Sequence, residues 1–493
     1  MDSYNEDQIL LNSLSISSQK VLKRTEQNNV PSLDSLPKSQ NVLMPKIKSN
    51  LINKIKNQCS KILSGPWSDL SNIHVEQKSG GLSNYLYVAS LNNSSLCPAD
   101  IPSKVLIRIY GEILRSNVDS VILDSIVFAI LSEKKFGPTL HGVFSGGRIE
   151  QYIESRTLSR KEMRNPKIWP LIARKLAKFN SLPMPMNKNN SIIKTLGKFI
   201  DQVKYPEKIL ESRIAGNKEI QSIFKHHDEI KSLKADPIDA NEERRVNSLL
   251  LIKAKDFHEN FNLQNEYDWI CNQILTVHKE DFPTVFCHND LQYNNILVAP
   301  NKKVEIAIDL LLIDFEYCSY NFRGFEIGNV INEWSLDYSS KHPDGFKYLP
   351  ETVAKLEEQI NFTAHYLSES LNIHEDGYIQ RGNQLGLDYL KSLDDSDIEV
   401  IMINKDNQGL ENANNLVTVK PTKLNMLEVQ YGILLSHFFW GAWSFVQGFM
   451  SNIEFNYIGY AELRLELYHK CKKYLLEDFE KDWSAYEARN NQS

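Results

Sequence analysis

Three side chains with oxygen donors stand at defined spacings in the second half of the chain. Asp290 is followed five residues later by Asn295, and Asp314 comes after the next run of apolar residues. Transfer of a phosphoryl group to an alcohol requires a group that accepts the hydroxyl proton, and ligands for the magnesium ion that neutralises the phosphates. A carboxylate and an amide on one loop, with a second carboxylate on a later strand, supply both. We therefore expect phosphoryl-transfer chemistry at these three residues.

The residues around these three extend the pattern. His288 precedes Asp290 by two positions, and Phe315 follows Asp314 directly. The order and spacing resemble the catalytic-loop and DFG motifs of protein kinases. Each residue alone has an ordinary explanation, because Asp and Asn are common in turns. The joint match predicts Asp290 as the catalytic base, and Asn295 and Asp314 as magnesium ligands that also belong to the catalytic set.

Two features nearer the N-terminus suit a nucleotide. The segment SGGLSN, residues 79–84, lies between two predicted strands, and its glycines allow backbone N–H groups to approach a phosphate. Arg108 lies in a third predicted strand, where its guanidinium can bind phosphate in a bidentate manner. Neither feature is specific alone, because a Gly-Gly hairpin is often only a turn and a strand arginine is often only half-exposed. Asp124, in the following predicted helix, is expected to hold Arg108.

Patterns of apolar residues predict how the chain positions these groups. Strands are predicted over IHVEQ, YLYVAS, KVLIRIYG, PTLHGVF and GRIEQYI, with a helix from Val118 to Phe136. Beyond Arg160 the patterns are mostly helical, and the short segments TVFCHND and LLLIDFE are predicted to be strands that carry polar loops. The predicted divisions are a disordered tail (1–45), an N-terminal nucleotide-binding lobe (46–155) and a C-terminal catalytic and substrate lobe (156–493) with a polar insert at about 391–422.

The composition argues against several other classes of protein. The formal net charge is −6 over 493 residues and no basic stripe occurs, so nucleic acid is not expected as a partner. The apolar runs are too short to cross a bilayer, and the N-terminus lacks the basic and apolar regions of a secretion signal. None of the six cysteines has CxxC spacing, which argues against a zinc site. We expect a cytoplasmic protein without a membrane span.

Longer segments of the chain resemble the choline/ethanolamine kinase family, which has a protein-kinase-like fold, and the match is nearest to its choline kinases. The matching segments span about residues 75–465 in family order and are SGGLSN, VLIRIYG, DSIVFAILSEKKFGPTLHGVF, GRIEQYI, VFCHNDLQYNNILV, LLIDFEYCSYNFRGFEIGNVINEW, SHFFWGAWSFVQ and IEFNYIGYAELR. The resemblance implies an α+β, bilobal fold. Its small mixed N-terminal lobe would contain an antiparallel sheet, and its larger C-terminal lobe would be mainly helical.

The resemblance also implies ATP and Mg²⁺ as cofactors and a role for each matched position. The residues expected to bind ATP are Ser79, Gly80, Gly81, Leu82, Ser83, Asn84, Tyr85, Arg108, Gln151 and Asp314. Those expected to hold magnesium are Asn295, Asp314 and Glu316. The amino-alcohol site is expected to comprise Asp290, Gln292, Tyr317, Glu333, Tyr338, Trp440, Trp443, Tyr457 and Tyr460.

The chemistry of choline explains why aromatic residues are expected in this set. A quaternary ammonium donates no N–H hydrogen bond, so rings and a nearby carboxylate must hold it through cation–π and Coulomb attraction. Trp440 and Trp443 are three residues apart, as are Tyr457 and Tyr460, so each pair can share one helix face. An aromatic residue at helical spacing is more often part of a core. Joined to the kinase motifs, the set favours a cation pocket.

Three positions depart from the family pattern. Asn294 stands where the family usually has Gly, and we expect there a left-handed backbone that Asn tolerates. Glu326 replaces an Asp, and its extra methylene is expected to loosen a contact to the catalytic loop. Asn180 replaces a His that is frequent in the family. None of the three removes a catalytic residue.

Several functions stay open at this point. The first is ATP-dependent phosphorylation of choline to phosphocholine, which opens the CDP-choline route to phosphatidylcholine. The second is an ethanolamine kinase or a dual enzyme, because a small pocket discriminates methyl groups only modestly. The third is a catalytically dead, kinase-like protein that binds nucleotide without turnover. A kinase of another small molecule, such as an aminoglycoside, fits the aromatic set less well. The family resemblance further suggests a homodimer.

Overall fold

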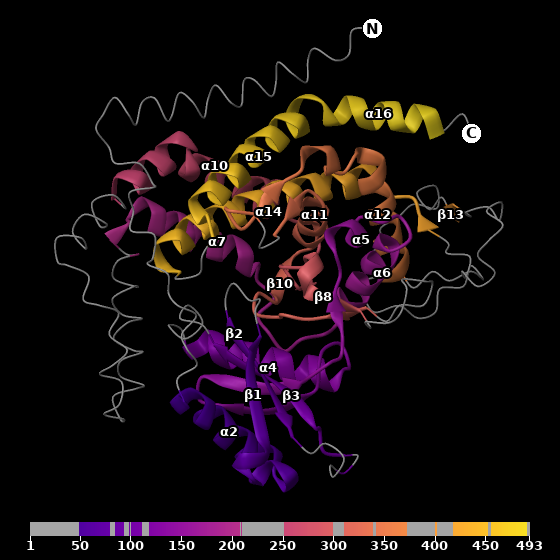
Figure 1. Cartoon of the computed structure of the whole chain (residues 1–493). Coiled ribbons are helices and arrows are strands. Elements are labelled where there is room, and N and C mark those ends of the chain that lie inside the picture. Colours follow the sequence, from indigo (N-terminus) through magenta and orange to yellow (C-terminus); the bar gives the residue numbers. More distant parts are fainter. Residues whose placement is uncertain are drawn as a thin grey trace.

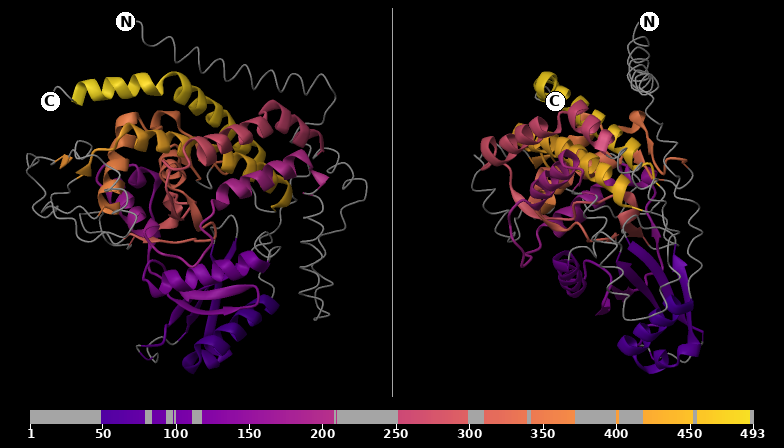
Figure 2. Two further views of the ribbon diagram at one scale, coloured as in Figure 1. Left: turned by 180° about the vertical axis from the view of Figure 1, so that it is seen from behind. Right: turned by 90° about the vertical axis from the view of Figure 1, so that its left-hand side faces the viewer.

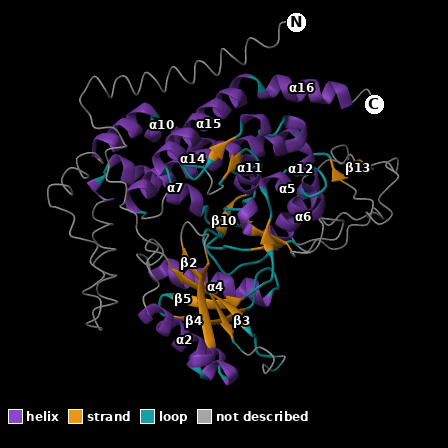
Figure 3. Ribbon diagram, in the orientation of Figure 1, coloured by secondary structure: helices purple, strands orange, loops and turns teal. Residues whose placement is uncertain are grey.

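The chain folds into two lobes that follow one another along the sequence (Figure 1). The computed structural model describes residues 49–78, 84–92, 98, 100–110, 118–207, 209, 251–298, 310–338, 342–371, 400–401, 418–451 and 455–490. Views from behind and from the side show the same division (Figure 2). Within the described ranges, only the N-terminal lobe is built on a large sheet (Figure 3). The expected α+β, bilobal architecture is confirmed. The predicted tail and most of the predicted insert lie outside the described residues.

A five-stranded antiparallel sheet with strand order β1-β2-β3-β5-β4 forms the N-terminal lobe. Its strands are β1 (Ile73–Lys78), β2 (Asn84–Leu91), β3 (Lys104–Tyr110), β4 (Leu140–Phe144) and β5 (Gly147–Gln151). In β1, Ile73 and Val75 are buried and the residue after each is exposed, as the period-2 pattern predicts. Helix α2 (Ser49–Leu63) adds Ile55 and Cys59 to the same apolar core. This core stabilises the strand that carries Arg108.

Helix α4 (Val118–Glu133) lies between this sheet and the C-terminal lobe (Figure 1). Its buried residues Val127 and Phe128 belong to the apolar core of the C-terminal lobe, not to that of the sheet. The ring centroid of Phe128 lies 6.0 Å from that of Phe315. The helix therefore connects the small lobe to the loop that carries Asp314.

Helices make up most of the C-terminal lobe. They are α5 (Arg160–Met163), α6 (Trp169–Asn180), α7 (Ser191–Lys204), α10 (Leu263–Asn272), α11 (Arg323–Glu333), α12 (Leu356–Ser370), α14 (Lys423–Met450), α15 (Tyr457–Glu477) and α16 (Phe479–Asn490). The aromatic helix α14 packs against both α11 and α15 and is buried along most of its length. Among the described residues, no helix combines the length and the apolar character that a membrane span requires.

The backbones of α11 and α14 approach each other at glycine residues. A Cβ added to Gly432 on α14 would overlap the main chain of Gly324 on α11, so only glycine permits this contact. The close approach brings polar side chains of the two helices together one to two turns farther along. Asn329 Oδ1 on α11 accepts a hydrogen bond of 2.9 Å from Trp440 Nε1 on α14. The helix contact thus fixes the position of an expected substrate residue.

Short strands and single helical turns carry the polar loops. The strands are β6 (Arg156–Thr157), β7 (Thr284–Cys287), β8 (Ile296–Val298), β9 (Leu311–Leu312), β10 (Ser319–Phe322), β11 (Leu336–Asp337), β12 (Lys347–Tyr348), β13 (Val400–Ile401) and β14 (Thr418–Val419). Turns of 3₁₀- or π-helix lie at Gly65–Ser68, Leu70–Asn72, Gln273–Val277, Tyr293–Asn295 and Pro350–Thr352. Strands β6, β8 and β9 form one small sheet, and β7 pairs with β10. These two pairings hold the loops on which Asp290 and Asp314 lie.

Candidate active site

Asp290 and Asn295 lie on one loop, between β7 and β8. Asn295 Nδ2 donates to the Asp290 carbonyl oxygen at 2.8 Å and to its carboxylate Oδ2 at 3.0 Å. Burial raises the pKa of Asp290 well above its ordinary value, and the carboxylates of Glu333, Asp314 and Glu316 act in the same direction. The loop therefore holds a carboxylate in surroundings that favour the uptake of a proton.

Asp314 lies beside this loop, just beyond the end of β9. The Ile313 N–H donates to the Asn295 carbonyl oxygen at 3.0 Å, and His288 Nε2 donates to the Ile313 carbonyl oxygen at 2.9 Å. Burial lowers the pKa of His288 to about 4, so the ring is neutral near pH 7 and serves as a structural donor. These bonds bring the predicted base, amide and second carboxylate together.

The backbone of the loop differs from one expectation. Our expectation of a left-handed backbone at Asn294 is wrong, because that residue lies in a 3₁₀ turn and its φ is not positive. Near the site, Asn289 and Asp314 have positive φ, each at 66°. Asn tolerates this region, and Asn289 Nδ2 also donates to the Tyr317 carbonyl oxygen at 2.8 Å and to Ser319 Oγ at 2.9 Å. The left-handed turn before Asp290 is thus fixed by side-chain hydrogen bonds.

Arg108 connects the two lobes. Its buried guanidinium donates through Nε to Glu150 Oε1 and through Nη1 to Asp314 Oδ1, each at 2.9 Å. Asp124, which we expected to hold Arg108, instead forms an ion pair with Arg148. The register of the sheet explains this correction, because Arg108 on β3 stands directly opposite Arg148 on β5. Two adjacent guanidinium groups need carboxylate partners. Arg108 and Arg148 both donate to Glu150, and Asp124 is the second partner of Arg148.

Of the remaining residues expected to bind ATP, the structure describes Asn84, Tyr85 and Gln151, which lie on strands of the small lobe or at their ends. Ser79, Gly80, Gly81, Leu82 and Ser83 lie outside the described residues. Asn84 begins β2, and Tyr85 beside it is 42% exposed. Gln151 ends β5, and its Oε1 accepts hydrogen bonds from Thr139 N at 3.1 Å and Thr139 Oγ1 at 3.0 Å. Gln151 thus stands where the sheet leads into the C-terminal lobe, and its role at adenine stays a prediction.

The residues expected to hold magnesium present only oxygen donors to a metal. Asn295 and Asp314 are held side by side by the pairing of β8 with β9, and Glu316 follows two residues after Asp314. Carboxylate and amide oxygens are the ligands that Mg²⁺ prefers in proteins, so the donor set fits this ion. Gln292, expected near the transferred group, lies on the Asp290 loop, and its Oε1 accepts a hydrogen bond from Asn294 Nδ2 at 3.4 Å.

Four of the expected substrate residues form a continuous row of ring contacts, called the aromatic row below. Its members are Tyr317, Trp440, Trp443 and Tyr457. Successive ring centroids along this row are 5.2, 5.3 and 6.0 Å apart, and each contact is edge-to-face. Trp440 and Trp443 come from α14, and Tyr457 begins α15. The row therefore gathers rings from a loop and two helices that are distant in sequence.

Glu333 lies at the end of α11, beside two other expected substrate residues, Tyr338 and Tyr460. The Tyr338 hydroxyl donates to Glu333 Oε1 at 3.2 Å and lies 2.7 Å from the Tyr460 hydroxyl. Arg464 Nη1 donates to the same Oε1 at 3.3 Å. Glu333 Oε2 is buried, and among the described residues it has no hydrogen-bond partner. The charge of Glu333 also acts on Asp290, so the expected cation site and the expected base lie near each other.

Sequence reasoning missed two residues that complete this arrangement. Arg464 holds Glu333, and Asn329 holds Trp440. A signal for Arg464 was present, because it follows Tyr460 by four positions and so shares its helix face. A buried arginine requires a partner, and Glu333 is that partner. Nothing in the sequence distinguishes Asn329 from other polar residues of α11.

Glu326, which replaces the Asp of the family pattern, still contacts the loop of Asp290. Its Oε2 accepts a hydrogen bond from the Asn289 N–H at 3.2 Å, so the longer side chain keeps this contact. Asn180, the other departure, donates to the Phe286 carbonyl oxygen and accepts from the Tyr366 hydroxyl, both at 2.8 Å. Both substitutions are therefore accommodated by hydrogen bonds.

Burial raises the pKa of Glu326 from 4.5 to about 7, which makes stability depend on pH. In the unfolded chain the carboxyl ionises at the lower value, so the folded state binds more protons across this window and stability falls as the pH rises through it. We expect the free energy of unfolding of the wild type to fall relative to Glu326→Gln by up to about 3 kcal/mol between pH 4.5 and 8. Urea unfolding at a series of pH values measures this difference.

Glu280→Gln, whose side chain is 90% exposed, is the control. Parallel curves for the wild type and Glu326→Gln would contradict the assignment.

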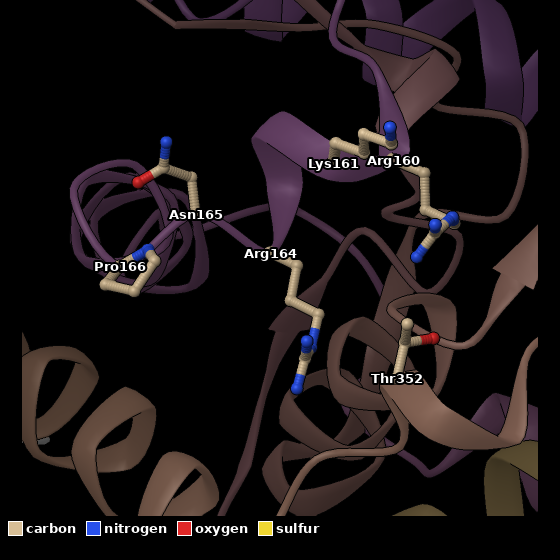
Figure 4. Close-up of a pocket in the computed structure, with 6 residues that line it drawn as sticks. All are labelled: Arg160, Lys161, Arg164, Asn165, Pro166 and Thr352. Atoms are coloured by element: carbon tan, nitrogen blue, oxygen red, sulfur yellow. The ribbon is translucent and has the colours of Figure 1, made fainter.

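A surface cavity of about 360 Å³ lies away from these residues (Figure 4). Its lining residues are Arg160, Lys161, Arg164, Asn165, Pro166 and Thr352. It belongs to α5 and the segment before α12, and none of the expected site residues lines it. Its polar groups are partly used within the protein, since Arg160 Nη1 donates to the Trp334 carbonyl oxygen and Arg164 Nη2 to Glu358.

Comparisons with known proteins identify the family of the chain. The sequence model of the choline/ethanolamine kinase family matches residues 75–469. A human choline/ethanolamine kinase is 33% identical over 417 residues, which is 84% of each chain. Two solved structures share the fold with a TM-score of 0.53 each. The choline kinase of Cryptosporidium parvum is 22% identical, and the alignment covers 86% of this chain and 96% of that one. The ethanolamine kinase of Plasmodium vivax is 20% identical, with 88% and 93% covered. The chain therefore belongs to the choline/ethanolamine kinase family.

Proposed function

We propose that the protein transfers the γ-phosphoryl group of ATP to the hydroxyl of choline, releasing phosphocholine and ADP. One observation carries this proposal: besides burial, the charges of both Glu333 and Asp314 raise the pKa of the half-buried Asp290 carboxylate, so Asp290 lies near both side chains. Asp314 suits metal-bound phosphates, and Glu333 suits a cation. An alcohol with a cation two carbons from its hydroxyl can occupy both places at once.

Asp290 is proposed to act as the base. The hydroxyl oxygen attacks the γ-phosphorus while the bond from that phosphorus to the bridging oxygen breaks, and the hydroxyl proton passes to Asp290. The burial that raises the pKa of Asp290 favours this proton transfer. The hydrogen bond from Asn295 Nδ2 to Asp290 Oδ2, 3.0 Å long, orients the carboxylate.

The nucleotide is proposed to bind between residues 79–85 and Arg108. The guanidinium of Arg108 contacts the carboxylate of Asp314 and suits bidentate binding of phosphate oxygens. Asn295, Asp314 and Glu316 are proposed to hold Mg²⁺, which neutralises phosphate charge when bound.

The aromatic row and Glu333 are proposed to hold the trimethylammonium group. Ring faces attract a quaternary ammonium within about 6 Å, and Glu333 adds Coulomb attraction without needing a donor on the ligand. Tyr338 and Tyr460 fix the carboxylate and supply further ring surface. These contacts favour choline over alcohols without a cation.

A coupled assay of ADP release over choline, its mono- and dimethyl analogues and ethanolamine tests the proposal. With ATP and magnesium we expect kcat/KM to be higher for choline than for ethanolamine by about tenfold, the size of discrimination that a few methyl groups allow. A higher value for ethanolamine would reverse the proposed order. Nucleotide binding without turnover of any amino alcohol would instead identify a kinase-like binding protein.

A carboxylate oxygen of Glu333 favours ethanolamine phosphorylation as the second candidate. Glu333 Oε2 is buried and has no partner among the described residues, and a primary ammonium can donate a hydrogen bond to it. Choline cannot make that bond. The same assay decides between the two substrates, and comparable kcat/KM values would indicate a dual enzyme.

The family resemblance supports two accompanying expectations, a homodimer and a cytoplasmic location. Light scattering of the purified protein measures the first. Imaging of the tagged chain in cells tests the second.

A further inference from the structure

Arg464 on α15 is a fully buried arginine with more than one partner in the expected substrate site. Its Nη1 donates to Glu333 Oε1 at 3.3 Å and to the Tyr460 hydroxyl at 3.0 Å. Its Nη2 donates to the Ser436 carbonyl oxygen at 3.1 Å and to Ser436 Oγ at 3.0 Å. One guanidinium thus connects the ends of α11 and α15 with the middle of α14.

These contacts continue to the aromatic row. Ser436 Oγ donates to Asn329 Oδ1 at 2.8 Å, and the same oxygen accepts from Trp440 Nε1 at 2.9 Å. Arg464 is therefore linked to the carboxylate of the cation site through one hydrogen bond and to a tryptophan of the row through Ser436 and Asn329. The planar fork of arginine can hold these partners in fixed relative positions, whereas a lysine ammonium cannot reproduce that geometry.

The positive charge of Arg464 affects the ionisation of Glu333. Burial raises the pKa of Glu333, and Arg464 and the Tyr338 hydrogen bond oppose that rise. The other titratable groups near this pair among the described residues are the tyrosines Tyr293, Tyr338 and Tyr460, together with Asp290, His437 and Cys471. Burial raises the pKa of the phenols and of Cys471 and lowers that of His437, so these groups supply no positive charge near pH 7, and Asp290 can carry only a negative one. Among these groups, Arg464 is the cation whose charge favours the ionised form of Glu333.

We propose that Arg464 is a positioning residue for recognition of the amino-alcohol cation, which keeps Glu333 charged and aims it together with Tyr460 and Trp440 at the ligand. The inference rests on the proposed function, because it concerns the same site. It assigns to Arg464 no contact with the substrate. Glu333 Oε1 is occupied by Tyr338 and Arg464, so Oε2 is the oxygen that faces the ligand.

Replacement of Arg464 by methionine keeps the length of the side chain and removes its charge. We expect Arg464→Met to raise KM for choline at pH 7 by about tenfold or more, with a smaller effect on kcat, since an uncompensated buried carboxylate takes up a proton. Raising the pH ionises Glu333 again, so KM is expected to fall back toward the wild-type value between pH 7 and 9. Arg464→Lys keeps a positive charge but lacks the planar guanidinium. We expect it to raise KM for choline less than Arg464→Met does, and to keep the pH profile of the wild type.

Arg323→Met is the matched control, because Arg323 also forms a buried ion pair, with Glu428, outside the site. We expect it to lower the melting temperature without a pH-dependent change in KM. Calorimetric titration with choline in the absence of ATP measures choline binding separately from turnover. A loss of affinity in Arg464→Met that is the same at every pH, or no loss, overturns the inference. Failure of the wild type to bind or turn over any amino alcohol counts against the proposed function instead.

Discussion

Asp290→Asn is expected to abolish most of the phosphoryl transfer. An asparagine keeps the size of the side chain, and its oxygen can still accept the hydrogen bond that Asn295 Nδ2 makes at 3.0 Å. It cannot take up the hydroxyl proton. We expect kcat to fall about a thousandfold while KM for choline stays within about threefold, because proton transfer and cation binding are separate contributions. Initial rates over a range of choline concentrations give both constants.

The surface variant Asp281→Asn is the control for this measurement. Asp281 is partly exposed and pairs with His278 at 3.1 Å, away from the loop of Asp290. We expect it to leave kcat unchanged. A folded Asp290→Asn protein that keeps wild-type kcat would rule out Asp290 as the base. The circular dichroism spectrum and melting temperature show whether the variant is folded.

Gly432→Ala is expected to cause the largest loss of stability from the addition of one methyl group. The new Cβ would overlap the main chain of Gly324 on α11, and neither backbone can move without separating two helices. We expect the free energy of unfolding to fall by about 3 kcal/mol, at the upper end of overpacking effects. Urea unfolding measures this loss. The shift of α14 would also lengthen the contact between Asn329 and Trp440, so KM for choline should rise in the protein that remains folded.

Gly448→Ala on the same helix controls for the helix propensity of alanine. Its added Cβ would lie 2.9 Å from Ile458 Cδ1, the far end of a flexible side chain, and 3.2 Å from Tyr457 Cβ, and it would overlap no main-chain atom of another described helix. The expected change in stability is within about 1 kcal/mol, the ordinary difference between glycine and alanine in a helix. Equal effects of the two substitutions would show that α11 and α14 are not held at Gly432.

The sequence predicted the elements and the loop motifs well, because these depend on local patterns. Alternation of apolar residues located β1, and the aromatic run located α14. Asp290, Asn295 and Asp314 were found because their spacing along the chain reflects chemistry. Their proximity then follows from the antiparallel pairing of β8 with β9.

Contacts between distant elements were not predictable in the same way. The partner of Arg108 depends on which residue of β5 stands opposite it, and that register is set by the whole sheet. Asn329 belongs to the site only because glycines allow α11 to approach α14 so closely. Neither fact is encoded in a short stretch of sequence, so the correction at Asp124 and the omission of Asn329 have a common cause.

The position of α4 restricts how the two lobes can open. Val127, Phe128 and Leu131 contribute to the core of the C-terminal lobe, and Phe128 contacts the ring of Phe315, next to Asp314. Swinging the small lobe away as one rigid body would expose these side chains to water, at about 25 cal/mol for each Å² of apolar surface. We therefore expect nucleotide exchange to leave α4 docked, with the outer strands of the sheet moving instead.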